Sequence, residues 1–266
     1  AVDRLGGSVA GIGDFDGDGV DDLAIGAPGA DPNGGRSGRV YVVFGRPTFP
    51  AVLNAGALAP GEAVVVNGGS GGDEAGGAVA AAGDVNADGI DDLVIGASEA
   101  DVGANSAAGR SYVVFGAADP AATIELASLD GSTGVRFDGE ALEDRSGFAV
   151  AGAGDVNGDG VDDVAIGTFG ADGGAGFFSG RAYVVFGAAG GIGASLALAD
   201  LDGGNGFRIN GAAADDVLGF SIAGAGDVDG DGLGDLVIGA PRVDVDDRSE
   251  AGVGYLLFGR TVPFPS

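Results

Sequence analysis

The residues with the clearest chemical potential are acidic side chains that recur with one spacing in four loops. Counted from the first aspartate of each loop, positions 1, 3, 5 and 9 hold 14 Asp and two Asn. These residues are Asp14, Asp16, Asp18 and Asp22; Asp84, Asn86, Asp88 and Asp92; Asp155, Asn157, Asp159 and Asp163; and Asp227, Asp229, Asp231 and Asp235. Alternate residues of a tight loop can direct their oxygens to one centre, and hard oxygen ligands favour Ca²⁺. The pattern therefore predicts about four calcium ions, one in each loop.

Two further loop positions support this interpretation. Position 6 is Gly in every loop, which permits a sharp turn. Position 7 is apolar, so we expect its side chain to face the core while its carbonyl oxygen faces the ion. The residues at position 7 are Val20, Ile90, Val161 and Leu233. Position 12 is Ile rather than Glu, and no helical pattern flanks the loops, so they are not EF-hands.

The alternative interpretation is that these loops only make turns, because Asp and Gly are common turn residues. Three or four carboxylates directed to one point would repel one another and raise their pKa values. A divalent cation removes that conflict. The repetition of the complete pattern in four loops favours the ion.

Composition excludes several classes of function. The net charge is −28, which disfavours nucleic acid and anionic membrane surfaces as partners. No apolar run is long enough to span a bilayer. His and Cys are absent, and calcium spacing accounts for almost every carboxylate cluster, so we expect no enzyme activity. The low free calcium of the cytosol favours an extracellular or cell-surface location.

The elements that position the loops repeat with them. The first aspartates lie 70, 71 and 72 residues apart. Each repeat contains an alternating stretch before the loop, an apolar run after it and a Tyr-containing strand, and three repeats contain a fourth strand. We expect an all-β fold, a β-propeller of four-stranded antiparallel blades, over one repeat domain, 1–266. The repeats cover approximately 1–70, 71–141, 142–213 and 214–266.

At these residues the sequence resembles the FG-GAP repeats of integrin α-chain β-propellers. Gly147-Phe148 and Gly219-Phe220 match the FG element, and Gly26-Ala27-Pro28 and Gly239-Ala240-Pro241 match the GAP element. The resemblance implies calcium in the loop between the first two strands of each blade, and a role in adhesion, protein–protein interaction or surface structure. The family's ring usually has about seven blades. Four repeats therefore imply part of a larger ring, an open array or a unit completed by another chain.

The partner, a protein or a surface glycan, is not identified by the sequence. Phe169, Phe177 and Phe178 form an aromatic group between two strands of the third repeat, and they are either a partner surface or local packing. A lectin-like propeller or a non-catalytic accessory domain of a larger secreted enzyme is the alternative function. Sugar sites usually need exposed aromatic faces, whereas Trp is absent and the four Tyr share one strand position, which favours the core.

Overall fold

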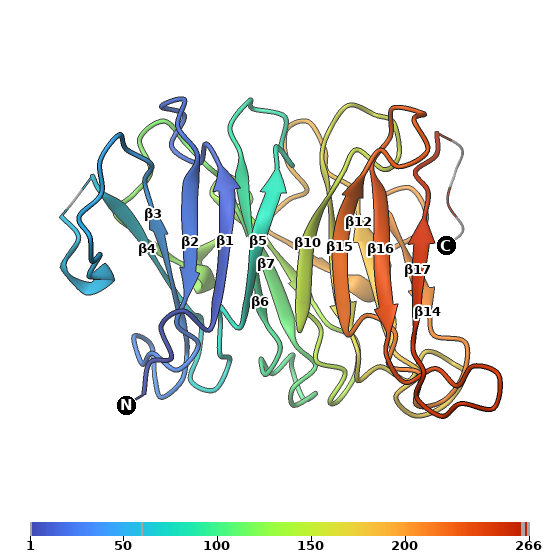
Figure 1. Ribbon diagram of the computed structural model, residues 1–266. Helices are drawn as coiled ribbons and strands as arrows, with labels where there is room; N and C mark the ends of the chain where they lie inside the picture. The colour runs from blue at the N-terminus through green and yellow to red at the C-terminus, as the bar shows by residue number, and fades with distance from the viewer. Residues whose placement is uncertain (1, 60, 262–263, 265–266) are drawn as a thin grey trace.

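The computed structural model describes residues 2–59, 61–261 and 264, and within them the chain is all-β (Figure 1). Seventeen strands form four sheets, and the described residues contain no α-helix, only three short 3₁₀ helices. The described residues include no helix that could span a bilayer.

Each sheet is built mainly from one sequence repeat. Sheet one contains β1 (Ser8–Gly13), β2 (Asp22–Gly26), β3 (Arg39–Val43), β4 (Ala63–Asn67) and β8 (Thr123–Glu125), in that order. Sheet two contains β5 (Ala78–Gly83), β6 (Asp92–Ala97), β7 (Arg110–Val114), β9 (Gly134–Asp138) and β13 (Ser195–Ala197). Sheet three contains β10 (Ala149–Gly154), β11 (Asp163–Thr168), β12 (Arg181–Val185) and β14 (Gly206–Asn210). Sheet four contains β15 (Ser221–Gly226), β16 (Asp235–Ala240) and β17 (Val253–Leu257).

The expected strands of each repeat are present, and they pair antiparallel in chain order. The fourth repeat has three strands within the described residues, as its sequence indicated. Two short strands were not expected. β8 and β13 pair in parallel with β4 and β9, the outermost strands of the preceding repeats. They lead into the 3₁₀ helices η2 (Leu126–Ser128) and η3 (Leu198–Asp200), while η1 (Ala55–Ala57) lies in the first repeat.

The sheets succeed one another from the N-terminal to the C-terminal end of the molecule (Figure 1). Their first strands β1, β5, β10 and β15 lie side by side in that order. Small residues permit this approach: a Cβ on Gly152 of β10 would come within 2.7 Å of the Ala81 carbonyl oxygen of β5. The core therefore consists of apolar layers between consecutive sheets.

The two end sheets expose their outer faces. Val9 and Leu23 of sheet one are 69% and 46% exposed, whereas the equivalent Leu93 of sheet two is fully buried against sheet one. Val237 and Leu256 of sheet four are 41% and 43% exposed. The described residues therefore form four sheets with three interfaces and no closed ring.

Candidate metal centre

The acidic loops connect the first two strands of each repeat. A bulge at the end of the first strand turns the chain into the loop, and the position 9 aspartate begins the next strand. Position 6 has φ between +87° and +91° in all four loops, a conformation that glycine adopts without strain. The glycines are Gly19, Gly89, Gly160 and Gly232. The local sequence thus fixes the loop geometry.

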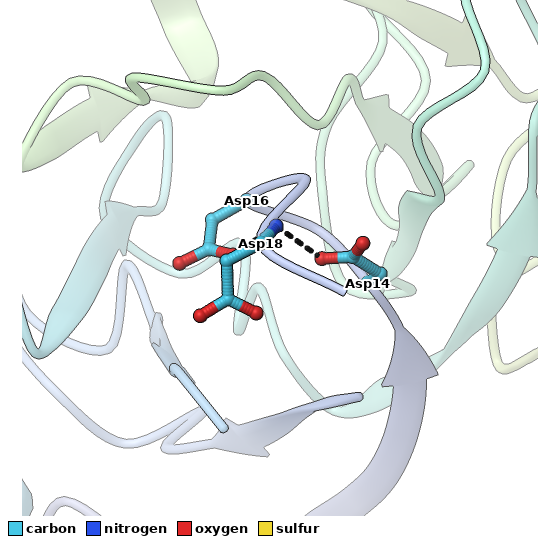
Figure 2. A group of neighbouring side chains, drawn as sticks. All are labelled: Asp14, Asp16 and Asp18. Carbon is cyan, nitrogen blue, oxygen red and sulfur yellow. Dashed lines mark hydrogen bonds between the residues drawn. The ribbon is translucent and has the colours of Figure 1, made fainter. Parts of the chain in front are cut away.

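Backbone hydrogen bonds hold the carboxylates of the first loop in place. Asp14 accepts the N–H of Asp18 at 2.9 Å through one oxygen and the N–H of Gly19 at 2.8 Å through the other. Asp16 accepts the same Asp18 N–H at 3.1 Å, and Asp18 accepts the Val20 N–H at 2.8 Å. Asp14, Asp16 and Asp18 therefore surround the turn (Figure 2).

The carboxylates converge. Asp14, Asp16 and Asp18 each place an oxygen within 4.8 Å of the others, and Asp227, Asp229 and Asp235 do the same in the fourth loop. The second and third loops repeat these hydrogen bonds with Asn at position 3, where the amide oxygen of Asn86 or Asn157 accepts the position 5 N–H. The donor atoms are oxygens alone, a set that fits a hard divalent cation.

The position 9 aspartates are fully buried and connect each loop to its sheet. Asp92 accepts the Val85 N–H from its own loop and the Gly116 N–H after the third strand, both at 2.9 Å. Asp22, Asp163 and Asp235 make the equivalent pairs of bonds. Position 9 therefore has a structural role in addition to its expected role as a ligand.

Burial disfavours the ionised form of these acids. It raises the pKa of Asp22 to about 6, of Asp163 to about 7 and of Asp92 to about 8. Backbone hydrogen bonds oppose this shift, and neighbouring loop acids reinforce it. Burial also raises the pKa of Asp16. A bound cation would restore the charged forms, because opposite charge favours ionisation.

Position 7 follows the expected burial except in the first repeat. Val161 is 8% exposed, and Ile90 and Leu233 are partly buried beside the preceding loops, near Gly17 and Gly158. The expectation that Val20 faces the core is wrong, because its side chain is 42% exposed. No described repeat precedes Val20, so it lacks the neighbouring loop against which Ile90 packs.

Sequence reasoning missed the residues that join neighbouring loops. Asp91 and Asp162, at position 8, accept the N–H of Asp14 and of Asp84, the first residue of the preceding loop, at 2.9 Å. In the fourth repeat the residue is Gly234, whose N–H donates to the Asp155 carbonyl at 2.8 Å. The signal was the recurrence of Asp at position 8 in three loops. Its partner could not be found without knowing that the loops are adjacent.

The predicted aromatic surface divides into two parts. The Phe169 ring packs against Phe148 and Phe220, with ring centroids 4.5 and 5.9 Å apart. Phe177 and Phe178 lie in the next turn of the chain and are 76% and 41% exposed. Phe169 is thus a packing residue next to the FG phenylalanines, while Phe177 and Phe178 remain candidates for a partner surface.

Comparison with known proteins places these features in a family. The model of the FG-GAP repeat matches residues 6–43, 75–114 and 218–257. An integrin alpha pat-2 of Caenorhabditis elegans is 31% identical over 253 residues, which cover 90% of this chain and 18% of that protein. An integrin alpha pat-2 of Caenorhabditis briggsae is 38% identical over 96 residues, 34% of this chain and 7% of that protein. The chain thus spans less than a fifth of the length of these relatives.

Proposed function

Because this chain is an FG-GAP repeat protein similar to integrin α chains, we propose that it is an extracellular calcium-binding module for adhesion or protein–protein interaction. Its four sheets would be consecutive blades of a β-propeller. The observation that carries the proposal is the convergence of carboxylate oxygens in the first and fourth acidic loops.

Calcium is the ion that this donor set suits best. The proposed ligands in each loop are the side chains at positions 1, 3, 5 and 9 and the carbonyl oxygen at position 7. Nitrogen and sulfur donors are absent from these positions, which disfavours zinc and copper. Magnesium prefers a strict octahedron with several waters, whereas calcium accepts an irregular cage of six to eight oxygens.

The ion would stabilise more than one loop. It would neutralise the carboxylates of its own loop, whose backbone hydrogen bonds define the turn. Asp91 and Asp162, at position 8, accept the N–H groups of Asp14 and Asp84 in the preceding loops. Through these hydrogen bonds, an ion that orders one loop would also restrain the loop before it. The row of loops would then act as a rigid edge, and the surfaces around it could present partner contacts without an ordering cost on binding.

The blade arrangement is supported by the contacts between sheets. The first strands are adjacent and the sheets pack face to face, as propeller blades do around a centre. The conspicuous acids are engaged in structural hydrogen bonds, which supports a non-catalytic role. Closure of a ring would require further blades or another chain at the two exposed end faces.

A thermal unfolding experiment tests the proposal. Calcium that binds only the folded state stabilises it by about 2.7 kcal/mol per site at a hundredfold excess over Kd. We expect the melting temperature to rise in millimolar calcium and to fall on chelation. Asp18→Ala should reduce this response, whereas Asp16→Asn should retain it, because Asn stands at that position in two other loops. An identical melting temperature in calcium and in chelator would refute the proposal.

A further inference from the structure

One of the three interfaces between sheets has hydroxyl side chains where the other two have apolar ones. Between sheets two and three these residues are Ser111 of β7, Ser146 just before β10 and Thr168 of β11, and all three are fully buried. The residues at the same repeat positions are Val40, Ala75 and Ala97 between sheets one and two, and Ala182, Leu218 and Ala240 between sheets three and four. The strand register supports this alignment, because the second residue of the third strand pairs with the equivalent glycine of the second strand in each of the first three sheets.

The three hydroxyl residues surround one point of the backbone, Gly147. Gly147 directly follows Ser146, and its N–H donates at 3.2 Å to the carbonyl of Gly167, the residue before Thr168. A Cβ on Gly147 would come within 2.6 Å of the Ser111 Oγ. At each of the other two interfaces, the three equivalent residues belong to one core cluster. The hydroxyls therefore share one small region of the interface.

None of these three hydroxyl oxygens has a hydrogen-bond partner among the described residues. Other buried serines are paired: Ser37 accepts the Asn33 N–H at 3.0 Å, and Ser179 accepts the Gly173 N–H at 2.7 Å. An unpaired buried hydroxyl destabilises a fold, so buried polar side chains are almost always paired with protein or with ordered water. Three unpaired hydroxyls in one place indicate a ligand that pairs them together.

We propose that Ser111, Ser146 and Thr168 bind one buried water molecule that bridges sheets two and three. A buried water typically makes about three hydrogen bonds to polar groups that lack other partners. Ser111 belongs to sheet two and Thr168 to sheet three, so the water would bond to both sides of the interface. Water suits the site better than an ion, because the three side chains are uncharged and a buried charge without a counter-charge is costly.

The water site lies apart from the acidic loops. β11 begins at Asp163 of the third loop and ends at Thr168, and Ser146 precedes the strand whose far end leads into that loop. The water and the proposed calcium ions would therefore act at opposite ends of the sheets. This inference goes beyond the proposed function, and its failure would leave the calcium proposal unaffected.

A crystal structure at a resolution that shows ordered water tests the proposal directly. We expect a water within about 2.5–3.0 Å of the Ser111 Oγ and of at least one hydroxyl from the sheet three side. The variant with Ser111→Val, Ser146→Ala and Thr168→Ala, the residues of the interface between sheets one and two, should lack this water. Hydroxyls that bond only to one another or to backbone carbonyls, with no water between them, would overturn the proposal.

Unfolding in urea gives a second readout through a double-mutant cycle. Thr168→Val keeps the shape but removes one partner of the water, and we expect the unfolding equilibrium constant to rise about tenfold, with a similar effect of Ser111→Ala. Because both residues would bond to one water, the double variant should lose clearly less than the product of the two effects. Ser37→Ala is the matched control, since its hydroxyl bonds directly to a backbone N–H elsewhere, and its effect should multiply with that of Thr168→Val. Effects of Ser111→Ala and Thr168→Val that multiply in the same way would overturn the shared water.

Discussion

The structural role of the position 9 aspartates can be measured without calcium, and Asp92 is the most suitable residue for that measurement. Its two oxygens accept the Val85 and Gly116 N–H groups, both at 2.9 Å, and the side chain is fully buried. Asp92→Asn retains the shape but replaces one acceptor with an NH₂ group, which would face an N–H donor. One hydrogen bond is lost and one buried donor is left without a partner, which costs about 1–3 kcal/mol.

The assay is urea and thermal unfolding of the variant in chelator at pH 9, where Asp92, whose pKa burial raises to about 8, is mostly ionised. For a chain of this size, that loss corresponds to a decrease in melting temperature of roughly 2–12 °C. Asp88→Asn is the matched control, because Asp88 is exposed in the same loop: one oxygen still accepts the Ile90 N–H, and water can replace the bond that the other oxygen accepts from the Asn86 amide. Its unfolding free energy should change by less than about 0.5 kcal/mol. Equal unfolding free energies of the two variants in chelator would refute the claim that the position 9 aspartate stabilises the fold by joining the loop to its sheet.

Three further outcomes follow from the structure. In chelator, the unfolding free energy should decrease as the pH rises from 4 to 8, because the pKa values of Asp22, Asp163 and Asp92 are raised to about 6, 7 and 8 in the folded state. Over this range the folded state binds more protons than the unfolded state, and each pKa unit of difference is worth about 1.4 kcal/mol. Melting curves measured in excess calcium should lose this pH dependence. Ala87→Gly should raise the unfolding free energy measured in urea by about 0.5–1 kcal/mol, because Ala87 has φ +60° where the other three loops have Gly. Leu198→Ala should lower the unfolding free energy by about 2–5 kcal/mol, because Leu198 of η3 is fully buried in the core, and a loss below about 1 kcal/mol would contradict that role.

The acidic loops and the main strands could be predicted from the sequence because their determinants are local. The Asp and Gly register specifies the turn through bonds between residues at most nine positions apart, such as that from Gly19 to Asp14. The alternating and β-branched runs specify the strands that flank it. Repetition then made each local pattern visible four times.

The features that sequence reasoning missed depend on contacts between repeats. The partner of Asp91 lies 77 residues away, and β8 becomes a strand only because the edge of β4 is beside it. Val20 occupies a predicted core position, but its side chain is 42% exposed because no repeat within the described residues packs against it. Phe169 was grouped with Phe177 because the two are close in sequence, whereas the fold directs Phe169 towards Phe148.

Direct measurement of calcium stoichiometry is the sharpest test of the central claim. Equilibrium dialysis of the purified chain, with bound calcium counted per chain, should reach four ions at saturation, with affinities in the range of about 10⁻⁴–10⁻³ M typical of extracellular modules. No bound calcium at about 10 mM free ion, well above that range, would contradict the account.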